Sequence, residues 1–145
     1  MKRTLALAVI ASLSVAGLAR AAGPDPIAVR QAGQDLLEGN FIGMTAVVAA
    51  KGNVTKLRKP AKAIARWMKV FPTEFPPGSD KGENTKAEPA IWSNHAGFVK
   101  AADKLAADAE ILAGYAKAGD RAKVAAQLKV MDDDCDACHK RFVAK

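Results

Sequence analysis

The segment Val124–Phe142 near the C-terminus reads VAAQLKVMDDDCDACHKRF. Apolar residues and cysteines recur in it at alternating intervals of four and three, the spacing of one face of an α-helix. These positions are Val124, Leu128, Met131, Cys135, Cys138 and Phe142. The segment therefore predicts an amphipathic helix that has both cysteines of the chain on its apolar face.

The same helix contains Cys135-Asp136-Ala137-Cys138-His139, the Cys-x-x-Cys-His motif of c-type haem attachment. One helical turn separates the two thiols, which places their Cβ atoms about 5–6 Å apart. Each thiol can then form a thioether with one vinyl group of a single porphyrin, and His139 lies beneath the ring as the proximal iron ligand. We expect one covalent haem c.

A disulfide, a redox dithiol and half of a zinc site are the alternatives for a Cys-x-x-Cys pair. Zinc needs about four ligands, and beyond the motif the chain offers only one further cysteine or histidine, His95. A redox dithiol is expected near alternating strands and helices, but the long segments here show no strand-like alternation. These observations favour haem attachment.

The N-terminus predicts export. Lys2 and Arg3 precede an uncharged stretch of apolar and small residues, and Ala19-Arg20-Ala21 has the small-x-small form of a signal-peptidase site. We expect residues 1–21 to be a cleaved signal peptide and the mature protein to be periplasmic. A membrane anchor is the alternative, but residues 4–19 are fewer than the about 20 that span a bilayer.

The net charge and the length of the mature chain limit its function and its number of domains. Cleavage removes Lys2, Arg3 and Arg20 and no acidic residue, which lowers the formal charge from +7 to +4. Such a mild charge gives little support for nucleic-acid binding. Residues 22–145 are expected to form a single domain with a modest core.

Three further helices are expected before the haem helix. The first lies near residues 27–51, after Pro24-Asp25-Pro26, with Ile27, Gln34, Leu37, Met44 and Val48 along one stripe. The second ends near Val70 and starts or bends at Pro60. The third opens at Glu88-Pro89 and has Ile91, His95, Phe98, Ala102 and Leu105 on one face, before Gly119-Asp120 breaks the chain.

The connections between these helices indicate the architecture. Residues 71–86 contain three prolines and many polar residues, a composition typical of a long irregular crossover. The other connections are short. The sequence therefore predicts an all-α fold, an antiparallel four-helix bundle with the covalent haem near its C-terminus.

In these features the chain resembles the class II c-type cytochromes, the family of cytochrome c′ and cytochrome c556. The resemblance covers nearly the whole mature chain and rests on five stretches: Ala28–Gln31, Met44–Val48, Phe75–Gly78, Glu88–Ser93 and Cys135–His139. It implies a periplasmic four-helix haem protein in which His139 is the fifth iron ligand. It also implies single-electron exchange with periplasmic redox proteins or binding of small gases, and pairing of two copies through the first two helices.

One departure from the family concerns the sixth iron ligand. Six-coordinate, c556-like members commonly have methionine four residues after the arginine that matches Arg30, and here that position is Gln34. Glutamine is a poor ligand for haem iron. Gln34 either faces the iron, with Leu37 as steric cover, or lies on the helix surface. Met44 is expected in the core, with sixth-ligand binding as the less favoured reading because about 15 Å of helix separates it from Gln34.

Several other residues have two interpretations. Arg30 either contacts a haem propionate, as its family counterpart suggests, or is an exposed arginine near a helix start. His95 is expected to be a buried or boundary histidine rather than a ligand. The acidic run Asp132-Asp133-Asp134 is expected to be a solvated face that can steer a basic partner. Val143 stands where the family often has a basic residue.

Two functions follow from the sequence. The first is one-electron transfer through a His-ligated haem, and the alternative is a five-coordinate cytochrome c′ that binds NO or CO as a buffer or sensor. No paired carboxylates or second histidine suggest a catalytic site, so we do not expect an enzyme.

Overall fold

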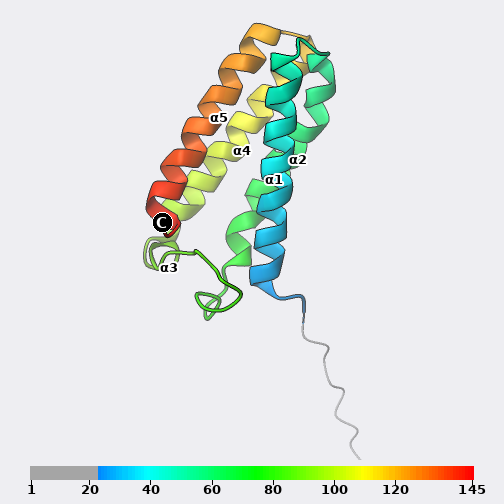
Figure 1. Ribbon diagram of the computed structural model, residues 1–145. Helices are drawn as coiled ribbons and strands as arrows, with labels where there is room; N and C mark the ends of the chain where they lie inside the picture. The colour runs from blue at the N-terminus through cyan, green and yellow to red at the C-terminus, as the bar shows by residue number, and fades with distance from the viewer. Residues whose placement is uncertain (1–22) are drawn as a thin grey trace, which may run out of the picture.

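The computed structural model describes residues 23–145, and within them the chain forms the expected four-helix bundle. The four long helices are α1 (Pro26–Ala49), α2 (Arg58–Val70), α4 (His95–Ala118) and α5 (Arg121–Phe142). Three short elements accompany them: the 3-10 turns η1 (Val54–Leu57) and η2 (Phe71–Glu74) and the single-turn helix α3 (Ala90–Ser93). Successive long helices run antiparallel (Figure 1). The all-α prediction is confirmed, while the predicted signal peptide, residues 1–21, lies outside the described residues.

Local sequence explains where the helices begin and end. The Asp25 carboxylate accepts a hydrogen bond from the Ile27 amide at 2.9 Å, and Pro26 occupies the first helical position, where its missing N–H costs nothing. Pro60 falls in the first turn of α2, so it starts the helix without bending it. Gly119 ends α4 with a left-handed φ of 71°, a conformation that favours glycine.

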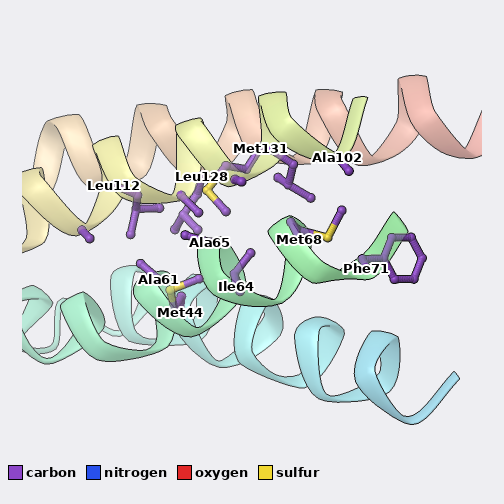
Figure 2. Packing of buried hydrophobic residues seen from close by; sticks show 14 of the residues in the cluster. Met44, Ala61, Ile64, Ala65, Met68, Phe71, Ala102, Leu112, Leu128 and Met131 are labelled. Carbon is purple, nitrogen blue, oxygen red and sulfur yellow. The ribbon is translucent and has the colours of Figure 1, made fainter. Parts of the chain in front are cut away.

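The core lies chiefly between α2 and α4, where small residues let the helices pack closely. The buried alanines of this contact are Ala61, Ala65, Ala102, Ala106, Ala109 and Ala113. Larger side chains, Ile64, Met68 and Leu112 among them, fill the space along the same seam (Figure 2). Val124, Leu128 and Met131 of α5 are buried in the same core, so α5 also packs against α4.

The third expected helix is interrupted, and this corrects one prediction. Asn94 has φ −127° and ψ 49°, outside helical values, and its side chain accepts a hydrogen bond from the Gly97 amide at 3.3 Å. The chain therefore forms α3, breaks at Asn94 and restarts as α4. His95 is the first residue of α4 and is exposed. Its predicted place on the apolar face was wrong, because the spacing from Ile91 crosses two separate helices.

Residues 75–89 form the crossover at one end of the bundle, where they run from α2 to α3 beside the N-terminal end of α1 and the C-terminal end of α5 (Figure 1). Within residues 23–145 no helix has the length and apolar character needed to cross a membrane.

Candidate haem site

A cavity of about 600 Å³ lies between the N-terminal half of α1 and the C-terminal half of α5. This volume falls within the roughly 300–1,000 Å³ of small-molecule and cofactor sites. Its walls are mainly apolar, with Met68 from α2 and with Leu105 and Phe98 from α4. Four phenylalanines surround one end, Phe71, Phe75, Phe98 and Phe142, and Phe98 packs against the other three with ring centroids 4.9–5.7 Å apart.

All three residues of the attachment motif line this cavity. Cys135 and Cys138 are partly buried, unpaired thiols, and His139 is exposed at the cavity edge. Burial raises the pKa of Cys135 to about 11, with a further contribution from the Asp132 carboxylate. Burial also raises the pKa of Cys138. Burial of both thiols therefore opposes formation of the thiolates that disulfide exchange requires.

The end of α5 is fixed to the crossover by backbone hydrogen bonds. Val143 and Ala87 form an isolated antiparallel bridge, in which the Glu88 amide donates to the Phe142 carbonyl at 3.0 Å and the Ala144 amide donates to the Lys86 carbonyl at 2.8 Å. Val143, which replaces the family's basic residue, thus belongs to a backbone contact that holds the turn bearing His139. No pattern in the sequence predicted this pairing.

Arg30 is buried, with 4% of its surface exposed, so the interpretation of Arg30 as an exposed arginine was wrong. Its guanidinium donates to the Ser79 hydroxyl at 2.9 Å, the Ser79 carbonyl at 2.7 Å, the Thr85 hydroxyl at 2.8 Å and the Glu74 carbonyl at 3.2 Å. The same group lies 4.4 Å from the ring centre of Phe75, and burial lowers its pKa. Arg30 therefore joins α1 to the crossover at the cavity wall, and a propionate contact stays a prediction.

The other residues singled out from the sequence separate into two groups. Gln34 and Leu37 both line the cavity from α1. Met44 does not line it: the residue is 1% exposed and lies in the core beside Ala61 and Ile64 (Figure 2). The structure thus places at the cavity the two residues expected on the distal side and places Met44 elsewhere.

The environment of Asp134 differs from the one that the sequence predicted. Asp134 was expected on a solvated acidic face, yet its side chain is only 10% exposed and lines the cavity beside Cys135. Its neighbour Asp133 does face solvent, with 66% of its side chain exposed. Asp134 precedes Cys138 by four residues, so the helical register alone places the two side chains on the same face. This spacing could have indicated that Asp134 faces the cavity.

The residues present fit a haem. Two neutral thiols one turn apart face an apolar cavity, and an imidazole follows the second thiol at the cavity edge. Residues 23–145 contain no group of three or more His, Cys, Asp or Glu side chains placed to hold a metal ion by themselves. Cys135 and Cys138 would hold a porphyrin, which would supply the iron, and His139 would be the protein ligand of that iron.

Comparison with known proteins gives the same interpretation. The family model described as cytochrome c′ matches residues 25–143. The cytochrome c′ of Rubrivivax gelatinosus is 36% identical over 123 residues, which cover 83% of this chain and 95% of that protein. Cytochrome c-556 of Agrobacterium tumefaciens (strain II Chrys) is 40% identical over 97 residues, or 67% of this chain and 71% of that protein.

Solved structures extend the match to the fold. A cytochrome c′ described as having an unusual ligand-controlled dimer dissociation aligns with a TM-score of 0.78 and 26% identity, over 86% of this chain and all of that chain. The attachment motif lies on the last helix at the wall of a haem-sized cavity, and nearly the whole described chain matches one family. The chain therefore belongs to the cytochrome c′ family, whose members bind a covalent haem c.

Proposed function

We propose that this protein is a periplasmic haem protein that binds a small diatomic gas, such as NO or CO, on the α1 side of the cavity. The observation that supports this best is the composition of that wall. The described α1 residues that line it are Arg30, Gln31, Gln34, Asp35, Leu37 and Glu38, and none is the methionine or histidine that usually completes a six-coordinate haem.

One methionine, Met68, does line the cavity, but it comes from α2 and not from α1. Met68 reaches the cavity from α2, but the residue is 3% exposed and its side chain packs toward α4 within the core (Figure 2). Its packing role is sufficient to explain its position, since methionine commonly fills gaps between helices. The proposal therefore assigns no sixth ligand to the protein.

The side chains have separate roles in this proposal. A bound haem would supply an iron that can accept a diatomic molecule or exchange one electron. His139 would be the proximal ligand, and the Gln34 amide could donate a hydrogen bond to a polar ligand on the opposite side. Leu37 and the phenylalanines would limit the size of the ligand and exclude water, because distal donors and steric access decide what a haem binds.

The test is the optical spectrum of the purified holoprotein, reduced with dithionite, with and without CO. We expect a broad high-spin Soret band that sharpens when CO is added. Gln34→Met should introduce a sixth ligand, produce sharp α and β bands and reduce the response to CO. The matched control is Leu36→Met, because Leu36 is 71% exposed and should leave the wild-type spectrum unchanged. A wild-type spectrum that is sharp and insensitive to CO would overturn the proposal.

One-electron transfer is the second candidate, and the exposure of His139 favours it. His139 and Cys138 lie at the cavity edge, so the side of the haem next to the attachment residues would be near the surface, where a periplasmic redox partner can approach. The sharp, CO-insensitive spectrum described above would favour this function over gas binding.

A second copy of the chain is the partner that α1 suggests. Leu36 and Ile42 are 71% and 60% exposed. A Cβ added at Gly39 or Gly43, on the same part of the helix, would point into open space. We propose that this surface pairs two copies. Sedimentation velocity should then show a dimer that Ile42→Lys dissociates, while Ile111→Lys on α4, at a residue also exposed, should not. A wild-type monomer at high concentration would contradict the pairing.

A further inference from the structure

Asp134 is a buried carboxyl that no part of the proposed function uses. It precedes Cys135 on α5, lines the haem cavity, and has only 10% of its side chain exposed. Its Oδ1 accepts a hydrogen bond from the Lys104 ammonium of α4 at 2.5 Å. Its Oδ2 is buried and has no hydrogen-bond partner. A buried acceptor without a partner is costly when ionised, so this oxygen favours a proton.

A second carboxyl shares the same ammonium. Asp108 Oδ2 accepts from Lys104 at 2.9 Å, and Asp108 Oδ1 accepts from the buried Gln127 amide at 2.7 Å. Asp108 is thus the fully hydrogen-bonded member of the pair, and Asp134 is the incompletely bonded one. Two carboxylates beside one ammonium leave one negative charge, which a single proton would neutralise.

The two environments move the pKa values of these carboxyls in opposite directions. Burial raises the pKa of Asp134, and this outweighs the hydrogen bond from Lys104. Burial also acts on Asp108, but the hydrogen bonds from Lys104 and Gln127 oppose it, and the pKa of Asp108 is lowered. Like-charged carboxyls at one site commonly separate in this way, with one holding the proton.

We propose that the Asp134 carboxyl is a proton-binding site coupled to electron exchange at the haem. When a one-electron oxidant such as ferricyanide removes an electron from the haem iron, the charge in the cavity becomes more positive by one, and Asp134 releases its proton to water. When a one-electron donor such as ascorbate returns the electron, Asp134 takes up a proton again. The inference requires haem in the cavity and is independent of the choice between gas binding and electron transfer.

Other charged groups also face the cavity, and their effects on the haem must be distinguished from that of Asp134. These are Arg30, Asp35 and Glu38 on α1, Lys86 in the crossover and His139 on α5. Asp134 differs from Asp35 and Glu38 because both of these are exposed. Exposed carboxyls respond less to a charge in the cavity, since water and salt screen them.

The test is the midpoint potential of the holoprotein measured against pH by spectroelectrochemistry. Between the pKa values of Asp134 in the oxidised and reduced proteins, the potential should fall as pH rises. A tenfold change in proton activity corresponds to at most about 59 mV for one electron. Asp134→Asn keeps an oxygen that can accept from Lys104 but cannot titrate, and it should remove this slope.

Two further variants separate proton binding from a structural role. Asp133→Asn changes the adjacent, exposed carboxyl and should leave the slope intact. Lys104→Gln removes the ammonium that favours ionised Asp134, so the sloping region should move to higher pH. A slope in Asp134→Asn equal to that of wild type would overturn the proposal. If Asp134→Asn does not bind haem, a sloping region that Lys104→Gln leaves in place would overturn it instead.

Discussion

Gly33 of α1 lies directly against the Trp67 ring of α2, and replacing it tests how tightly this contact is packed. A Cβ at Gly33 would lie 2.0 Å from Cζ2, 2.4 Å from Cη2 and 2.5 Å from Cε2 of Trp67. The Trp67 ring packs against Phe71 with centroids 5.7 Å apart, which restricts its movement. Gly33→Ala must therefore push α1 away from α2 or displace the ring.

Two opposing effects determine the magnitude. Inserting a methyl group into a packed contact costs about 1–3 kcal/mol, whereas alanine in a helix interior gains about 1 kcal/mol over glycine. Gly114→Ala on α4 isolates the second effect, because Gly114 is exposed and a Cβ there meets no atom within 4 Å. The stability of Gly33→Ala should therefore fall below that of Gly114→Ala by about 1–3 kcal/mol.

The assay is urea unfolding of the holoprotein followed by circular dichroism at 222 nm, with all variants measured at the same haem loading. In a Trp67→Leu background the clash is removed, so Gly33→Ala should become as stabilising as Gly114→Ala, a coupling that a double-mutant cycle measures. Equal stabilisation by Gly33→Ala and Gly114→Ala in the wild-type background would refute the reasoning.

Four other changes have definite expected outcomes. Arg30→Lys cannot reproduce the forked contacts with Ser79, so urea unfolding should show a loss of roughly 1.5–3 kcal/mol, and a loss below experimental error would contradict the crossover role of Arg30. Met44→Leu should cost less than about 1.5 kcal/mol and leave the haem spectrum unchanged, whereas conversion to a high-spin spectrum would identify Met44 as an iron ligand. Gly119→Ala should lower stability by about 1 kcal/mol because alanine disfavours the left-handed φ of 71°, and an unchanged melting temperature would argue against this helix cap. In the haem-free protein, burial raises the pKa of Cys135 from 9.0 to about 11. Between these pH values the folded state binds more protons than the unfolded state, so the free energy of urea unfolding should fall as pH rises from 9 toward 11. A rise in that free energy would contradict the burial of the thiol.

The sequence predicted the helices well where local signals coincide. The expected first helix at 27–51 is α1 at Pro26–Ala49, and the break at Gly119-Asp120 separates α4 from α5. Capping residues, prolines and a regular apolar spacing act within a few residues of one another, so they can be read without the fold. Asn94 shows the limit of this reading, because its side chain caps α4 and breaks a helix whose apolar spacing looks continuous.

The candidate site was predictable in part for a similar reason. The motif Cys135–His139 predicted the wall that would hold the haem, and its two cysteines and histidine do line the cavity. The amphipathic spacing predicted both cysteines on the inner side of α5, where they are partly buried. Arg30 and Asp134 were harder to place, because a charged residue is buried only when distant groups satisfy it. For Arg30 these are Ser79 and Thr85, and for Asp134 the group is Lys104.

The sequence by itself predicted the attachment motif, the four-helix architecture and most of the apolar positions, but not the break at Asn94. The tertiary structure alone decided which polar side chains are buried at the cavity and what they contact, including the Arg30 contacts with the crossover and the partly bonded Asp134. The physical reason is the distance along the chain over which each effect acts. Burial of apolar residues follows from the periodicity of neighbouring residues. Burial of a charged residue depends on partners that are distant in the sequence and that only folding brings together.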